Sequence, residues 1–114
     1  MKYSIIVALS DSIAPTDYKA WTDIGKKIQQ PPTVLNAVLK DAAQEIARSF
    51  PDLPSSIVWG NYLVFDEHGD FFVIDIDFEN VELIRDTVFH VAEKRGLTVL
   101  IGKENKIYRP GIPL

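Results

Sequence analysis

The segment FFVIDIDF, residues 71–78, decides the fold that this sequence predicts. Its even-numbered residues are all apolar, whereas the odd-numbered positions change from Phe71 and Val73 to two aspartates, Asp75 and Asp77. Because successive side chains of a strand point to opposite faces of a sheet, an extended segment buries the even positions and leaves the carboxylates in water. We therefore expect residues 71–78 to form a strand whose even-numbered face packs against helices.

The same strand is the second arm of a predicted β-hairpin. The first arm, residues 56–65 (SIVWGNYLVF), is also rich in β-branched and aromatic residues, and residues 67–70 (EHGD) between the arms favour a tight turn. Gly60 and Asn61 predict a bulge or a bend in the first arm. Trp59 lies next to this irregularity, where an aromatic side chain can anchor a binding partner.

The two ends of the chain predict the other strands of the sheet. Residues 2–9 (KYSIIVAL) are apolar on one face and largely apolar on the other, which is typical of a central strand. Near the other end, residues 97–101 (LTVLI) and 106–109 (KIYR) predict a final strand pair, separated by residues 102–105. The proline-rich tail, RPGIPL, does not extend this pair far.

Three helices are expected between these strands. The first begins near Pro15 and ends at the proline pair 31–32, because proline lacks the amide hydrogen and restricts the residue before it. The third spans about residues 79–94, and Gly96 lies where a C-terminal cap belongs. Thr33 is the predicted cap of the second helix, whose apolar stripe consists of Leu35, Val38, Leu39, Ala42 and Ile46.

The order of elements is strand, helix, helix, strand, strand, helix, strand and a short added strand. With right-handed crossovers, the simplest packing of this order is an α+β fold, with an antiparallel sheet and helices packed on one face, close to the ferredoxin-like order β-α-α-β-β-α-β(-β). We expect residues 1–114 to form a single domain, since a chain of this size can bury one core without disulfides or metal. The other sheet face is then open. It is a candidate partner surface or dimer interface, formed by Ile6, Ala8, Phe71 and Val73 or by their opposite-parity neighbours.

Composition and charge argue against several classes of protein. The apolar fraction of 46% and the charged fraction of 25% are those of a soluble globular domain. The absence of cysteine rules out a disulfide framework and a thiolate zinc site, and it fits the cytoplasm. The net charge of −4 argues against direct nucleic-acid binding. No run of about 20 apolar residues predicts a membrane span.

The acidic residues around the 71–78 strand allow three interpretations. Residues 66–82 (DEHGDFFVIDIDFENVE) contain four Asp, three Glu and one His. On a strand Asp75 and Asp77 point the same way and suit a hard cation, although no EF-hand is present, because Asn80 and Asp86 occupy the positions of its glycine and its bidentate glutamate. The other two interpretations are a solvated face and a negatively charged binding surface.

Residues with catalytic chemistry are few. His68 and His90 are the only histidines, and no GxSxG elbow, GxGxxG or P-loop pattern occurs. Without cysteine or a paired-histidine motif, neither histidine builds a transition-metal site by itself, and each is interpreted as a surface or half-buried structural residue. We therefore expect no enzymatic activity, no resident metal and no cofactor.

Both ends of the chain resemble a set of small bacterial proteins. The likeness rests on residues 1–7 (MKYSIIV), on the FP before the hairpin, and above all on residues 88–110 (VFHVAEKRGLTVLIGKENKIYRP). That set includes immunity proteins of polymorphic-toxin and contact-dependent growth inhibition systems, which bind and neutralise a cognate toxin domain. The resemblance implies a small bacterial toxin inhibitor. Its motifs are structural and assign no partner-binding residue.

These observations lead to one leading hypothesis and two alternatives. The leading hypothesis is an immunity protein that occludes a basic toxin, such as a nuclease, through an acidic surface. The first alternative is a ligand-sensing ferredoxin-like domain that dimerises through its sheet, and the second is a small metal-dependent enzyme that uses Asp75 and Asp77. For the leading hypothesis, Trp59 is a predicted anchor and the predicted contact acids are Asp66, Glu67, Asp70, Asp75 and Asp77.

Overall fold

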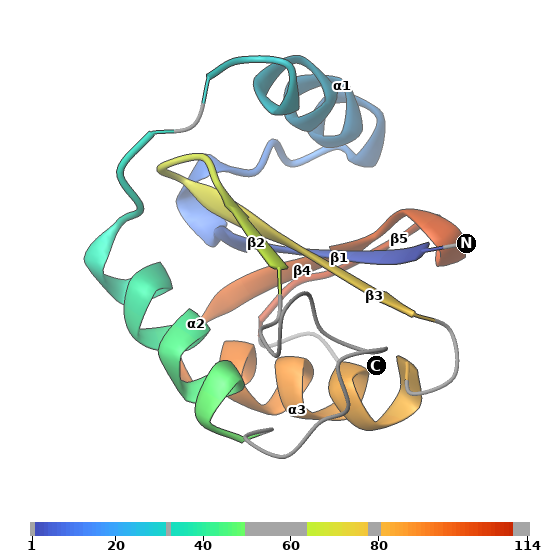
Figure 1. The fold of residues 1–114 in the computed structure, drawn as a ribbon. Helices are drawn as coiled ribbons and strands as arrows, with labels where there is room; N and C mark the ends of the chain where they lie inside the picture. The colour runs from blue at the N-terminus through green and yellow to red at the C-terminus, as the bar shows by residue number, and fades with distance from the viewer. Residues whose placement is uncertain (1, 32, 50–63, 78–80, 111–114) are drawn as a thin grey trace.

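A five-stranded antiparallel sheet forms the centre of the fold (Figure 1). The computed structural model describes residues 2–31, 33–49, 64–77 and 81–110. Along the chain the elements are β1 (Lys2–Leu9), η1 (Ser10–Ser12), α1 (Asp17–Ile28), α2 (Ala37–Arg48), β2 (Val64–Glu67), β3 (Phe71–Asp77), α3 (Val81–Lys94), β4 (Leu97–Ile101), η3 (Gly102–Glu104) and β5 (Lys106–Tyr108).

The strand order is β2-β3-β1-β4-β5, and each neighbouring pair is antiparallel. The predicted strand 71–78 is β3, which pairs with β1 on one side and with β2 on the other. Two split units, β1-α2-β2 and β3-α3-β4, interlock as in the ferredoxin-like arrangement, and β5 extends the sheet beyond β4. The predicted α+β class, the antiparallel pairing and the element order are confirmed.

Helices α2 and α3 cover one face of the sheet and enclose the larger core (Figure 1). Phe72 and Ile74 of β3 are fully buried there, and Ile5 of β1 lies opposite Ile74 in the register. The even-numbered side chains of β3 therefore pack beneath helices, as predicted, up to Ile74. Further buried members of this core are Val7, Leu39, Ala42, Ile46, Ile84, Val88, Val91, Leu97, Val99 and Ile101.

Helix α1 covers the opposite face of the sheet, which the sequence predicted to be open (Figure 1). Ala20 and Ile24 of α1 are buried, and Trp21 is half-buried beside them. The expectation that all helices pack on one face is wrong for α1. The residues of the expected partner or dimer surface lie in this second core, because this part of the sheet is apolar on both faces and both need cover: Ile6, Ala8, Phe71 and Val73, together with Leu100.

Asn36, and not Thr33, caps α2. Asn36 Oδ1 accepts a hydrogen bond from the Val38 N–H at 2.9 Å, and the helix begins one residue later than its cap. Thr33 forms a bridge with His68 instead, so residues 33–36 lie alongside the β2–β3 turn. At the end of α3, Gly96 has a left-handed φ of +66°, as expected for a helix C-cap.

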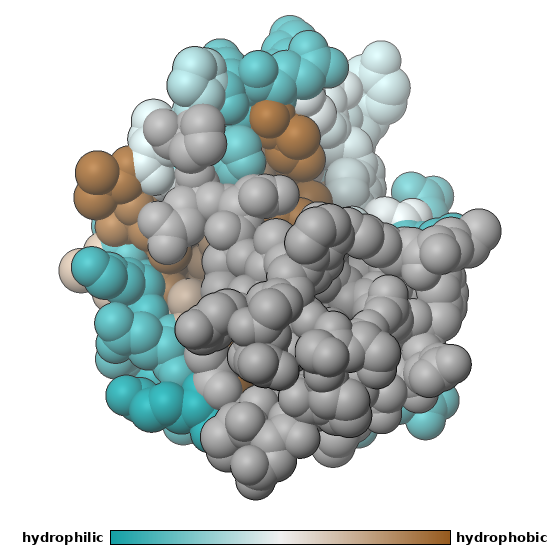
Figure 2. Space-filling view, viewed as in Figure 1, coloured by the Kyte–Doolittle hydropathy of each residue, from teal (hydrophilic) through white to brown (hydrophobic). Residues whose placement is uncertain are grey.

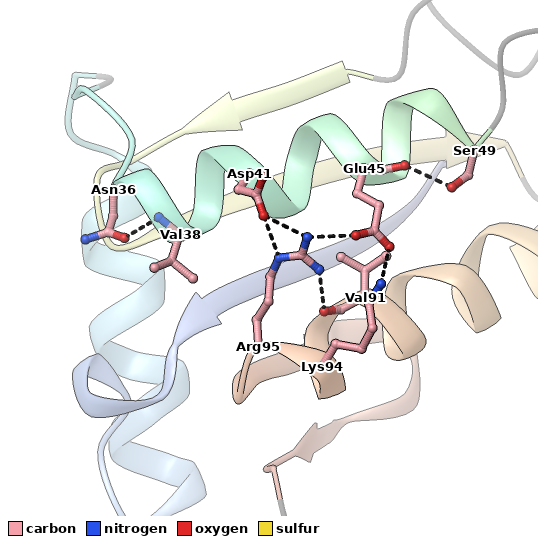
Figure 3. Close-up of polar contacts among 8 residues, drawn as sticks. All are labelled: Asn36, Val38, Asp41, Glu45, Ser49, Val91, Lys94 and Arg95. Atoms are coloured by element: carbon pink, nitrogen blue, oxygen red, sulfur yellow. Dashed lines mark hydrogen bonds and ion pairs between the residues drawn. The ribbon is translucent and has the colours of Figure 1, made fainter.

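Ion pairs join α2 to the end of α3 (Figure 3). Arg95 Nη2 lies 2.7 Å from both Asp41 Oδ2 and Glu45 Oε1, and Lys94 Nζ lies 2.8 Å from Glu45 Oε2. Hydrogen bonds from Lys94 and then Arg95 lower the pKa of Glu45 from 4.5 to about 2. The ionised form of Glu45 therefore helps to hold the two helices together beneath the sheet.

Candidate partner-binding surface

The β2–β3 hairpin carries all five predicted contact acids. Asp66 and Glu67 lie on β2, which is at one end of the strand order, and Asp70 lies in the turn. Asp75 and Asp77 follow in the second half of β3. Of these five residues, the structure describes the side chain of Asp70 and only the backbone of the other four. The fold thus brings Asp66, Glu67 and Asp70 together at the turn end of the hairpin.

Negative charge is concentrated on this hairpin and its flanks. From residue 49 to residue 84 the chain has eight carboxylates and no Lys or Arg. All 12 basic residues lie elsewhere, where they outnumber the remaining eight acids. One edge of the sheet is therefore formed by a strongly acidic part of a chain that is otherwise weakly basic. The eight acids are Asp52, Asp66, Glu67, Asp70, Asp75, Asp77, Glu79 and Glu82.

Asp70 pairs with the end of α1 and remains half-exposed. Lys27 Nζ lies 3.3 Å from Asp70 Oδ2, and both side chains are well exposed to solvent. An ion pair of this kind contributes only about 0–1 kcal/mol to stability, because water screens it and two long side chains lose freedom. A Lys or Arg of a binding partner can therefore replace Lys27 at Asp70 with little loss of stability.

The turn that carries Asp70 is held by several contacts. His68 stacks on Phe71 with ring centroids 4.8 Å apart, and the His68 N–H donates to the Phe71 carbonyl at 2.9 Å. Gly69 has a φ of +75°, and its carbonyl accepts a hydrogen bond from the Asn36 N–H at 2.9 Å. His68 thus has a structural part in the turn, as the sequence indicated.

Exposed aliphatic residues, which the sequence did not predict, lie beside this turn. Val34 is 92% exposed, and Val38 and Ile28 are 45% and 44% exposed. Figure 2 shows hydrophobic residues on this side of the molecule, over the segment between α1 and α2. The apolar stripe predicted for the second helix includes Leu35, which is buried, and Val38, which is exposed, so that prediction is wrong for Val38. Val34 lies outside the predicted stripe. Trp59, the predicted anchor, lies outside the described residues.

An open groove of about 500 Å³ lies at the other end of α1. Its wall is fixed by Arg109, whose Nη2 donates hydrogen bonds to the Ala14 carbonyl at 3.0 Å and to Asp17 Oδ1 at 3.2 Å. Two aromatic rings beside amide, hydroxyl and carboxylate groups suit a small polar molecule. The lining residues are Asp17, Tyr18, Trp21, Thr22 and Asn105.

The described ranges contain neither a cluster of metal ligands nor a membrane-spanning helix. There, no three side chains of His, Cys, Asp or Glu come together to hold a metal ion. Because the side chains of Asp75 and Asp77 are outside this description, the cation site suggested for that pair stays a prediction. No helix in the same ranges is long and apolar enough to cross a membrane.

Comparisons with protein-family models, with curated proteins and with solved structures find no match to this chain. The resemblance of its two ends to bacterial immunity proteins stays a prediction from the sequence. The distribution of charged and apolar residues on the β2–β3 side is the physical basis for a functional proposal.

Proposed function

We propose that this protein is an immunity-type inhibitor, which binds a basic bacterial toxin domain in the cytoplasm and blocks its active cleft without chemistry of its own. The observation that carries the proposal is the run of eight carboxylates, without Lys or Arg, between residues 49 and 84. Asp66, Glu67 and Asp70 of this run lie at the turn end of the hairpin formed by β3 and β2, which is at one end of the strand order.

Charge of one sign on such an edge has two effects on binding. It attracts a partner of opposite charge over about 8–10 Å at physiological salt and so speeds association. It also determines where the partner docks, because like charges repel and opposite charges align. A toxin that acts on nucleic acid needs Lys and Arg at its cleft to hold phosphates. In our proposal those residues contact the hairpin acids, and the substrate is thereby excluded.

Charge reversal at the hairpin tests this proposal. The probe is the purified product of the adjacent upstream gene, and the variant is Asp66→Lys/Glu67→Lys. We expect association to slow about tenfold or more at low ionic strength, because electrostatic steering is lost. The difference from wild type should shrink as salt is added, since exposed charges are screened. Association and dissociation rate constants from surface plasmon resonance provide the measurement.

The matched control is Asp86→Lys/Glu93→Lys, which makes the same change of net charge on exposed residues of α3. Equal slowing in both double variants would show that net charge, and not the hairpin, governs association. If the wild-type chain does not bind the probe, or the neighbouring gene encodes no toxin-like protein, the proposed function is wrong.

A ligand-sensing domain is the second candidate, and the groove lined by Tyr18 and Trp21 favours it. The sheet-face dimer that this candidate requires conflicts with the position of α1, which packs on residues of that face. A thermal-shift screen against metabolites discriminates between the two candidates, because a ligand that binds the folded state raises its melting temperature. A hit should lose its effect in Tyr18→Ala if the groove is the binding site.

A further inference from the structure

Val34 is almost fully exposed although it is a β-branched aliphatic residue. Among the residues whose side chains are described, it is the most exposed large hydrophobic one. A single exposed aliphatic side chain is common on protein surfaces, so exposure alone assigns no role to it. The conformation of the segment that presents Val34 gives the stronger argument.

Both neighbours of Val34 are fixed in place. Thr33 forms a bridge with the β2–β3 turn, and Leu35 is buried in the larger core. One residue further on, the Asn36 N–H donates to the Gly69 carbonyl at 2.9 Å, while the Asn36 side chain caps α2. This segment is therefore already ordered before any partner arrives. A partner that contacts Val34 avoids the entropy cost of ordering a loop, which favours affinity.

Negative charge borders this aliphatic group. Asp70 is half-exposed and follows Gly69 in the same turn, while Asp66 and Glu67 precede the turn on β2. Protein interfaces commonly combine a small apolar centre, which contributes most of the affinity, with a polar rim that determines partner choice. The turn next to the Val34 segment thus carries the half-exposed Asp70 side chain, and the backbone of Asp66 and Glu67 leads into the same turn.

We propose that Val34, together with the exposed side chains of Val38 and Ile28, is the apolar anchor with which this protein binds its partner. The anchor enters an apolar pocket that is bordered by Lys or Arg on a basic protein. This inference deepens the proposed function and rests on it, because the partner is the same toxin and the acidic rim is the same hairpin. The charge of the rim specifies the partner surface, and the anchor specifies a pocket within it.

A second copy of this chain is a poor occupant of the surface. In a two-fold dimer the same patch of both subunits meets, so the acidic hairpins of the two copies would be brought together and repel. Three aliphatic side chains also supply only a fraction of the roughly 800 Å² that each partner buries in a stable interface. A partner with a basic surface avoids this repulsion.

Dissociation kinetics of Val34→Ser test the inference, with the purified product of the adjacent upstream gene as the probe. The dissociation constant should rise about tenfold or more, mainly through faster dissociation. The rise should be the same at low and high ionic strength, because the anchor carries no charge. His90→Ser is the matched control, since it removes an exposed side chain on α3, outside the proposed surface. It should leave the dissociation constant unchanged, and both variants should unfold at the wild-type temperature.

The outcomes separate this inference from the function on which it rests. If Val34→Ser and Val38→Ser bind like the wild type while Asp66→Lys/Glu67→Lys binds weakly, the anchor is wrong and the acidic inhibitor stands. If the wild type does not bind the probe, both are wrong. A wild-type dimer that Val34→Ser converts into monomers in analytical ultracentrifugation would assign the surface to a second copy and overturn the inference.

Discussion

At the β2–β3 turn, the absence of a side chain on Gly69 brings two segments of the chain into contact. The φ of +75° at this residue is one that glycine adopts readily. A Cβ atom on Gly69 would lie 2.9 Å from Thr33 Oγ1, which is closer than such atoms normally approach. A side chain at position 69 would therefore require the Thr33 side chain to move. The presentation of Val34, the next residue, depends on the same contact.

Gly69→Ala should lower the free energy of unfolding by about 1–2 kcal/mol, because the left-handed φ is unfavourable for alanine and the added carbon meets Thr33. Gly25→Ala is the matched control. Gly25 is exposed in α1, and nothing lies within 4 Å of an added Cβ, so alanine should stabilise the helix by about 1 kcal/mol. Urea unfolding followed by circular dichroism measures both. Unchanged stability of Gly69→Ala would mean that the turn relaxes away from Thr33 without loss.

At the scale of elements, charge and apolar packing act together between α2 and α3. Their buried residues meet beneath the sheet, and the ion pairs of Arg95 and Lys94 with Asp41 and Glu45 lie at the surface of the same contact (Figure 3). Glu45 receives hydrogen bonds from both basic side chains. It is therefore the residue through which acid acts most directly on this helix pair.

Glu45→Gln should destabilise the protein at neutral pH, and the difference from wild type should vanish in acid. The pKa of Glu45 is lowered from 4.5 to about 2 in the folded state by hydrogen bonds from Lys94 and Arg95. A lowered pKa means that the ionised carboxylate stabilises the fold fully above pH 4.5 and loses this effect as the pH falls toward 2. Urea unfolding of both proteins across this range is the measurement.

Glu93→Gln, at an exposed position next to Lys94 in the chain, serves as the control for loss of a carboxylate on this surface. It should lower the free energy of unfolding at neutral pH by less than Glu45→Gln does. A destabilisation by Glu45→Gln that stays constant down to pH 2 would contradict the assignment of this pKa.

Local patterns predicted most elements because they depend on neighbouring residues alone. The alternation in residues 71–78 predicted β3, and Gly96 predicted the end of α3, since both rest on backbone geometry that adjacent residues determine. The side of the sheet that α1 covers was not predictable in this way, because an amphipathic helix packs equally well on either apolar face. The acidic residues of the hairpin could be identified from the sequence alone, because they form a run of carboxylates. The role proposed for Val34 was not, because it depends on how residues 33–36 pack against the β2–β3 turn.

At the scale of the whole molecule, the sheet is an inner layer with helices on both sides (Figure 1). The two helical layers bury different amounts of apolar side chain. Helices α2 and α3 bury many large side chains, whereas α1 buries Ala20 and Ile24 and half-buries Trp21. Polar contacts also hold α1 and the segment before it. Lys27 pairs with Asp70 at the C-terminal end of the helix, and Arg109 donates a hydrogen bond to the Ala14 carbonyl before its N-terminal end.

Ile24→Ala and Ile28→Ala measure how much α1 contributes. Ile24 is buried against the sheet, whereas Ile28 of the same helix is 44% exposed, so the same substitution compares a buried position with a partly exposed one. We expect a loss of about 2–4 kcal/mol for Ile24→Ala, from lost burial and the cavity left behind, and less than about 0.5 kcal/mol for Ile28→Ala. Urea unfolding gives both values. Similar small losses in both variants would mean that α1 does not shield the sheet.

The central position of β1 in the sheet affects how the polypeptide folds during its synthesis. β1 pairs with β3 and β4, which end at Asp77 and Ile101. Both edges of β1 can therefore be paired only after translation has reached β4, about 90 residues after β1 itself. A nascent chain stalled before residue 97 has one side of an apolar strand unpaired, and such edges pair readily with other chains. Chaperones that bind extended apolar segments should accordingly capture this protein during synthesis, and release it once β4 has been translated.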